Sequence, residues 1–230
     1  MLPSDDPRVL SLTQAVHAGD VEAADVLLRQ YPELATDRHG DAQLSRTALH
    51  IATDWPGNFP RVAETIAALV AAGAPVDGRF AGPHTETPLH WAASSDDVAA
   101  IDALLEAGAD LEADGAVLTG GTPLADAVVF AQWNAARRLV ERGAAMAIWQ
   151  AAALGEIEEL HRLIESGEHG AAEVTNACWH ACRGGQLAAV QLLVVNGADV
   201  DWLGYDNLTS RQAGMQSDSV ALIAWLEAQR

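Results

Sequence analysis

Apolar and small residues recur in a related order along the chain, as in Thr87-Pro88-Leu89-His90-Trp91-Ala92-Ala93. The proline suits the first turn of a helix, because its missing N–H has no partner to lose there. A leucine and two alanines follow at the spacing of one helix face. The segment therefore predicts the start of a short helix, and its recurrence predicts a repeat protein.

The recurrences define seven repeats, which begin at Leu10, Thr47, Thr87, Thr122, Met146, Asn176 and Thr209. The sixth position is alanine in the first six repeats: Ala15, Ala52, Ala92, Ala127, Ala151 and Ala181. With an insertion allowed in the second repeat, a second apolar stretch carries a leucine at its centre: Leu27, Leu69, Leu104, Leu139, Leu163, Leu193 and Leu226. Each repeat thus predicts two short antiparallel helices, whose apolar faces can be buried only against neighbouring repeats.

Glycines mark the expected ends of these helices. Three glycines predict a tight turn between the two helices of a repeat: Gly19, Gly155 and Gly185. Five others follow the second helix, where a left-handed backbone conformation is common: Gly73, Gly108, Gly143, Gly167 and Gly197.

Two segments, Thr87-Pro88-Leu89-His90-x-Ala92-Ala93 and Leu104-Leu105-x-x-Gly108-Ala109-Asp110, resemble the ankyrin repeat family, in its bacterial-type form. The resemblance covers nearly the whole chain. It implies an all-α solenoid of about seven stacked helix pairs with β-turn fingers and irregular loops. It also implies a single domain over 1–230, with an N-terminal cap at 1–40, internal repeats at 41–205 and a C-terminal cap at 206–230.

The resemblance assigns roles to several residues as well. The family usually binds proteins along its concave surface. Its motif histidine, here His50 and His90, hydrogen-bonds the loop near its own threonine and is structural. Trp149 and Trp179 occupy the same position, where a bulky side chain can fill the space between repeats.

The repeats are irregular in length. Their starts are 37, 40, 35, 24, 30 and 33 residues apart. The segment 55–60 enlarges a turn between two helices, the segment 114–121 lengthens a finger, and almost no finger remains before Met146. Because long loops on a compact scaffold are often functional, this irregularity favours a localised pocket.

Positions five, eight and nine of the first helix and the finger tips should line the concave face of an ankyrin-like array. Since neighbouring helices lie ~8–10 Å apart, the third and fourth repeats should bring Trp91 and Asp126 together. Exposed aromatic groups mixed with polar ones are typical of binding sites. The candidate ligand-binding residues are Trp91, Trp55, Ser94, Ser95, Phe130, Gln150, Phe59, Phe80, Trp133, Arg183, Trp202 and Tyr205.

Four residues are candidates for acid–base catalysis: Asp126, His180, Asp54 and His84. Desolvation beside Trp91 and Phe130 should raise the pKa of Asp126, which suits a general acid or base. Alternatively, Asp126 is solvated, or its side chain is hydrogen-bonded to the backbone of a finger. Cys178 and Cys182 fall at inward positions and are expected to be small buried hydrophobes. We therefore expect no metal and no cofactor.

Charge and composition exclude several classes of binding partner. The net charge of −19 disfavours phosphate backbones and anionic lipids, so we expect neither nucleic-acid nor membrane binding. All 13 basic residues are arginine, which excludes a Schiff-base lysine and a P-loop lysine. No apolar run is long enough to span a bilayer and no signal peptide is evident, so a cytoplasmic location is expected. The oligomeric state is open, and a monomer is compatible with the sequence.

Three functions remain open. The first is a scaffold that binds a protein or peptide segment, and the second is a pocket for a small organic molecule. The third is a cofactor-free enzyme for dehydration, isomerisation or cyclisation of a small or natural-product substrate. Binding ranks first and catalysis is the alternative.

Overall fold

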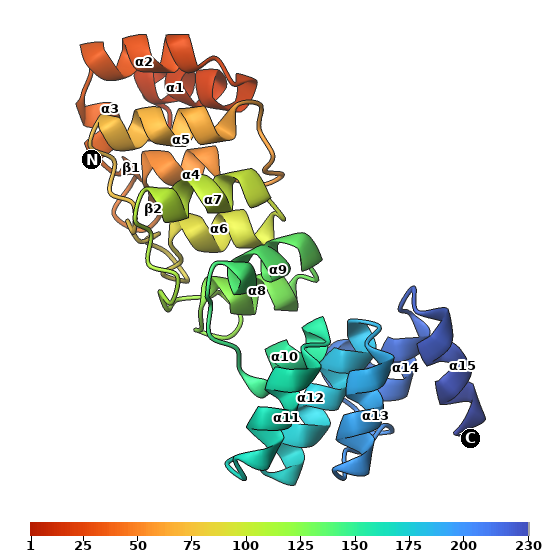
Figure 1. Ribbon diagram of the computed structural model, residues 1–230. Coiled ribbons are helices and arrows are strands. Elements are labelled where there is room, and N and C mark those ends of the chain that lie inside the picture. The colour runs from red at the N-terminus through yellow and green to blue at the C-terminus, as the bar shows by residue number, and fades with distance from the viewer. Residues whose placement is uncertain (230) are drawn as a thin grey trace. The chain divides into compact units, whose positions relative to one another are not determined.

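The structure is a computed structural model that describes residues 1–229. It divides into two compact units, an N-terminal unit of residues Met1–Ala144 and a C-terminal unit of residues Ala145–Arg230. Each unit is built from antiparallel helix pairs (Figure 1). Among residues 1–229, every helix is too short or too polar to cross a lipid bilayer. That the whole chain forms a single domain stays a prediction.

The N-terminal unit holds four helix pairs, one extra turn of helix and a two-stranded sheet. Its elements are α1 (Pro7–Ala18), α2 (Val21–Gln30), α3 (Glu33–Thr36), β1 (His39–Gly40), β2 (Ser45–Arg46), α4 (Ala48–Ala52), α5 (Val62–Ala71), α6 (Pro88–Ser94), α7 (Val98–Glu106), α8 (Pro123–Val129) and α9 (Trp133–Glu141). The strands are antiparallel, with His39 opposite Arg46, and they form the base of the first finger.

The C-terminal unit holds three helix pairs. Its elements are α10 (Ile148–Leu154), α11 (Ile157–Glu165), α12 (Ala171–Arg183), α13 (Leu187–Val195), the 3-10 turn η1 (Tyr205–Asn207), α14 (Ser210–Met215) and α15 (Val220–Ala228). With the four pairs before it, this confirms the seven predicted helix pairs. Only six residues separate α9 from α10, which confirms that almost no finger remains there.

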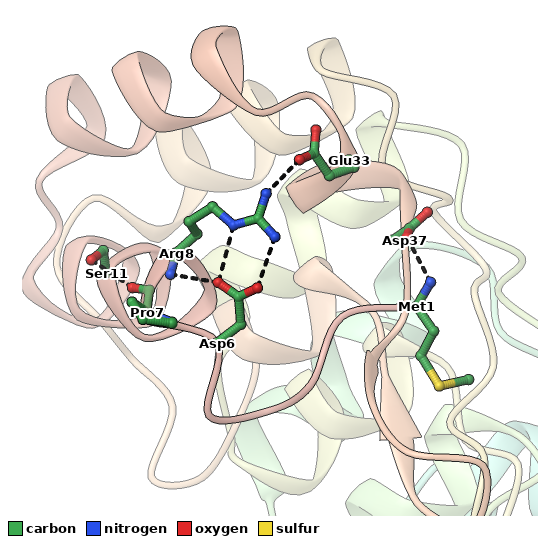
Figure 2. A network of polar contacts seen from close by, with 7 residues as sticks. All are labelled: Met1, Asp6, Pro7, Arg8, Ser11, Glu33 and Asp37. Atoms are coloured by element: carbon green, nitrogen blue, oxygen red, sulfur yellow. Dashed lines mark hydrogen bonds and ion pairs between the residues drawn. The ribbon is translucent and has the colours of Figure 1, made fainter.

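The first helix pair begins with a charged cluster (Figure 2). Asp6 caps α1 by accepting the Arg8 backbone N–H at 2.8 Å, and it also accepts from the Arg8 guanidinium. The guanidinium reaches Glu33 of α3 at 2.7 Å. These contacts lower the pKa of Asp6 to about 2, chiefly through the hydrogen bond from the Arg8 side chain. These contacts join the start of α1 to α3.

The alanine at the sixth position of a repeat closes the turn between its two helices. The alanine carbonyl accepts the N–H of the residue that precedes the second helix: Asp20 to Ala15 at 2.9 Å, Asp97 to Ala92 at 3.0 Å, Gln132 to Ala127 at 2.7 Å, Glu156 to Ala151 at 3.0 Å and Gln186 to Ala181 at 2.9 Å. The residue before that donor has positive φ, which confirms the predicted turn glycines. Asp96 and Ala131 adopt the same conformation without being glycine.

The leucine predicted at the centre of each second helix lies in the core in five repeats and outside it in two. Five of its leucines are fully buried: Leu69, Leu104, Leu139, Leu193 and Leu226. Leu27 and Leu163 are half-buried, and Leu28 and Leu160 lie in the core instead. The start of α12 was also misplaced, because this helix begins at Ala171, five residues before the predicted start of its repeat.

The motif histidines join one repeat to the next. Nδ1 of His90 accepts the Thr87 N–H at 3.1 Å, so Nε2 carries the proton and donates to the Gly121 carbonyl at 3.2 Å. His50 does the same with its own threonine and with the carbonyl of Glu86. The structural role of both is confirmed. Burial lowers the pKa of each imidazole and keeps it neutral.

Trp179 replaces this histidine in the C-terminal unit. Its indole N–H donates to the Leu208 carbonyl at 3.0 Å, immediately before the threonine that opens α14. The side chain is fully buried, as a residue filling the space between repeats should be.

Candidate functional site

An open pocket of about 400 Å³ lies in the N-terminal unit. Seven of the predicted site residues line it: Asp54, Trp55, His84, Trp91, Ser94, Ser95 and Phe130. Four residues outside the predicted site complete it, and of these only Glu86 was expected from the sequence to face the groove: Thr53, Glu86, Val117 and Gln132. The predicted grouping of aromatic and polar residues in the middle repeats is thus present as one hollow.

Three successive repeats contribute to the pocket. The loop after α4 supplies Trp55, the finger before α6 supplies His84 and Glu86, and α6 supplies Trp91. The segment after α8 supplies Phe130. Both irregular loops predicted to matter therefore reach the pocket, since Val117 comes from the lengthened finger.

Hydrogen bonds between loops hold the pocket walls in place. The Asn58 backbone N–H donates to Oδ2 of Asp97 at 2.7 Å, and its side-chain amide donates to the Ser95 carbonyl at 3.2 Å. On the other side, the Val117 N–H donates to Oε1 of Glu86 at 2.7 Å. The long loops are thus fixed against the adjacent repeats rather than left as free segments.

Aromatic rings form much of the lining and its rim. Trp55 is 81% exposed and Phe130 is 40% exposed, which is unusual for such large apolar side chains. Trp91 meets the edge of His50 with ring centroids 4.7 Å apart, and Phe80 lies 5.5 Å from the Trp91 ring. Phe80 also stacks on His84 at 4.5 Å. Because Phe80 is buried and does not line the pocket, it supports the predicted site from behind.

Two carboxylates give the pocket its charge. Oε2 of Glu86 lies 3.1 Å from Nδ1 of His84, and only 8% of the Glu86 side chain is exposed. Asp54 forms an ion pair with Arg46, which itself does not line the pocket. The eleven lining residues include no arginine and no lysine.

Asp126 is placed differently from the prediction. It sits on α8 at the expected position, but it is fully buried and does not line the pocket. Burial first, and then the charge of neighbouring Glu86, raise the pKa of Asp126 to about 9. A side-chain hydrogen bond with Glu86 adds to this shift. The predicted direction of the shift is confirmed, and the side chain is a neutral acid near pH 7.

Comparison with known proteins agrees with this architecture. The sequence model of the ankyrin repeat matches residues 84–113, which include the finger before α6 and the whole of α6 and α7. Residues 84–113 thus match the ankyrin repeat. The crystal structure of the human ASB11 ankyrin repeat domain superposes with a TM-score of 0.57 and 21% identity, covering 95% of this chain and 97% of that one. No curated protein sequence matches the chain.

Some predicted residues of this ankyrin-repeat chain lie outside the pocket. Phe59 stacks on His17 with centroids 4.1 Å apart, and Trp133 is half-buried at the start of α9. Gln150 is buried in the C-terminal unit, where its side-chain oxygen accepts the Ala147 N–H at 2.7 Å. It therefore caps α10, as the motif histidines cap α4 and α6.

The remaining predicted residues form an aromatic cluster in the C-terminal unit. The His180 ring lies 4.8 Å from Trp149 and 5.4 Å from Tyr205, and Tyr205 lies 6.3 Å from Trp202. Arg183 approaches the Trp179 ring at 5.8 Å. Burial, helped by the charge of Arg183, lowers the pKa of His180 to about 3, so this imidazole is neutral. It is placed to pack rather than to exchange protons near pH 7.

Cys178 and Cys182 are free and fully buried on α12, as expected for inward positions. The hydrogen bond with Cys178 and then burial raise the pKa of the Cys182 thiol. No group of three histidine, cysteine, aspartate or glutamate side chains in the described part of the chain could hold a metal ion.

The four lining residues outside the predicted site are only weakly indicated by the sequence. Glu86 directly precedes Thr87, where the finger enters the helix, and Val117 lies inside the lengthened finger. Thr53 and Gln132 lie next to predicted residues. Only the folded loops show that these four side chains reach the same hollow.

Proposed function

We propose that this ankyrin-repeat chain is a binding scaffold that takes a segment of a partner polypeptide in the pocket of its N-terminal unit. The observation that carries the proposal is the gathering of seven independently suggested residues around one open hollow. A volume of about 400 Å³ falls within the range of ligand pockets, which is roughly 300–1,000 Å³. The scaffold type is one that typically binds proteins.

The exposure of the rim supports a polypeptide occupant. Trp55 and Phe130 project at the mouth, and an aromatic side chain offers a partner a large contact area at low cost in conformational entropy. A small organic molecule is the other occupant that the pocket volume admits. We favour a polypeptide because the hollow is open, whereas small-molecule sites usually enclose most of the ligand surface.

Catalysis by the same pocket has less support. A general acid must come within hydrogen-bond reach of the atom it protonates. Asp126 has the raised pKa of a general acid, yet it is fully buried and does not line the pocket. Asp54 is held by Arg46, and His180 belongs to the C-terminal unit. A dehydratase, isomerase or cyclase activity is therefore the weaker candidate.

A selection from random peptides tests the proposal directly. The full chain is immobilised, a displayed library of short random peptides is selected on it, and the affinity of the enriched peptides is measured. Trp55→Ala should weaken them about tenfold or more, because a tryptophan that a partner covers commonly contributes about 1–2 kcal/mol or more. Its large exposure makes it a variant that leaves the fold intact.

Tyr205→Ala is the matched control, since it removes an exposed aromatic ring from the C-terminal unit. Enriched peptides should bind this variant as tightly as they bind the unmodified chain. If Trp55→Ala leaves their affinity unchanged, or if Tyr205→Ala is the variant that abolishes binding, the pocket is not the binding site.

A further inference from the structure

We propose that the pocket of the N-terminal unit is selective for a cationic side chain, an arginine or a lysine, on the bound polypeptide segment. This inference rests on the proposed function, because it names the chemistry of the partner at that same site. It is carried by three features of the lining: its charge, its aromatic rings and the buried acid behind it.

The charge of the lining is one-sided. Glu86 and Asp54 are among its residues, and no arginine or lysine is. Glu86 is 6% exposed, so its charge acts in a partly dehydrated setting where electrostatic interactions are stronger than in water. Its Oε1 accepts from the Val117 backbone, which holds the carboxylate in a fixed position. A fixed, largely buried carboxylate without a neighbouring guanidinium suits an incoming cation.

The aromatic rings point to the same ligand. Trp55, Trp91 and Phe130 all line the hollow. A cation above an aromatic face is attracted by the quadrupole of the ring, and the attraction is greatest for tryptophan. Arginine and lysine also pack their apolar stems along such rings. A neutral apolar side chain would use the rings alone and would add nothing to the contacts that Glu86 makes with His84 and Val117.

The third feature is the buried acid Asp126, which lies next to Glu86. It is fully buried, and it interacts with Glu86 through the charge of that residue and through a hydrogen bond between the two side chains. Two adjacent carboxyl groups in a dry site disfavour a second negative charge. Asp126 therefore stays protonated, and the negative charge of the pair rests on Glu86, where a cation in the pocket would be attracted and an anionic side chain would not.

The whole chain has the matching long-range charge. It carries 32 acidic and 13 basic residues, so a basic segment is attracted at a distance and an acidic one is repelled. Binding of a basic segment should therefore weaken as salt is added.

The test compares two glycine-flanked peptides that differ only in charge. One carries arginine and the other carries citrulline, which keeps the shape of arginine without its charge. Binding to the full chain is followed by the shifts of the tryptophan indole N–H signals. We expect the arginine peptide to bind about tenfold more tightly, and a matching lysine peptide to bind more tightly than citrulline as well.

Variants tie the preference to the pocket. Glu86→Gln keeps an oxygen for the Val117 N–H and removes the charge, so it should bring the arginine peptide down to the affinity of the citrulline peptide. Trp55→Ala should weaken the arginine peptide in the same way. Glu106→Gln makes the same charge change on the exposed face of α7 and should have no effect.

Three results would overturn the inference. The first is equal binding of the arginine and citrulline peptides, and the second is an unchanged preference in Glu86→Gln. The third is binding of agmatine, a small guanidinium compound, as tightly as the arginine peptide, because the pocket would then recognise a small organic cation. Library peptides that need Trp55 but lack basic residues would overturn only this inference, and an absence of Trp55-dependent peptides would overturn the proposed function.

Discussion

Replacing Asp126 by asparagine should make the chain less sensitive to rising pH. Asp126 is fully buried, and burial together with the charge of Glu86 raises its pKa from 3.8 to about 9. The folded state therefore holds this proton more tightly than the unfolded state does. A proton held more tightly in the folded state stabilises it at low pH, and this contribution is lost as the pH rises from the unfolded pKa to the folded one.

The size of the effect follows from the two pKa values. Each pH unit between them costs the folded state about 1.4 kcal/mol relative to a variant that does not titrate. From about pH 5 to about pH 7, the difference in unfolding free energy between Asp126→Asn and the unmodified chain should grow by about 3 kcal/mol. The asparagine amide can add a constant offset to this difference, so the slope with pH is the informative quantity.

Urea unfolding at several pH values measures this slope. Both proteins share the same C-terminal unit, so its contribution cancels in the difference. Asp5→Asn serves as a control, because it removes an exposed carboxylate from the same unit and should stay within about 0.5 kcal/mol at every pH. A difference between Asp126→Asn and the unmodified chain that does not change with pH would refute the buried, protonated acid.

Four further substitutions test the fold in the same assay. Ala131→Gly should stabilise the chain by up to about 1 kcal/mol, because Ala131 has a φ of 57° that costs alanine about 1–2 kcal/mol; destabilisation would contradict this. Gly184→Ala should cost more than Gly108→Ala, since an added Cβ would lie 2.1 Å from the Ala153 carbonyl oxygen at Gly184, whereas at Gly108 it would meet nothing within 4 Å and would cost only the backbone strain of a φ of +92°; a greater cost at Gly108 would contradict this packing. His180→Phe should make the chain lose about 2 kcal/mol less unfolding free energy than the unmodified chain when the pH is lowered to about 5. The pKa of His180 is lowered from 6.5 to about 3, so the unfolded state binds a proton at a higher pH than the folded state does. An equal loss in the variant and the unmodified chain would show that His180 is not buried as a neutral base.

The sequence predicted the repeats because their signals are local. A threonine cap, a close-packed alanine and a left-handed glycine each depend on a few neighbouring residues, and all three recur. Leu27 and Leu163 show the limit of this reasoning. The core position moved to Leu28 and Leu160, and the choice between neighbouring apolar residues depends on packing against the next repeat, which periodicity does not describe.

The site was predicted in part for a similar reason. Repeat register placed Trp91, Ser94 and Phe130 together, and the structure brings them together. Register also placed Asp126 on the face of its helix that lines the groove, but the folded chain buries it completely. The contact between Glu86 and Val117 was not predicted, because it is a hydrogen bond between two loops, and the path of an irregular loop is set by contacts distant in sequence.

The most direct test of the central claim is a spectrum of the tryptophan indole N–H groups, recorded with and without an enriched basic peptide. The seven tryptophans are divided between the units, and only Trp55 and Trp91 line the pocket. The account predicts that these two signals shift on binding, while Trp149, Trp179, Trp202 and Trp225 of the C-terminal unit stay in place. Shifts confined to the C-terminal tryptophans would contradict it.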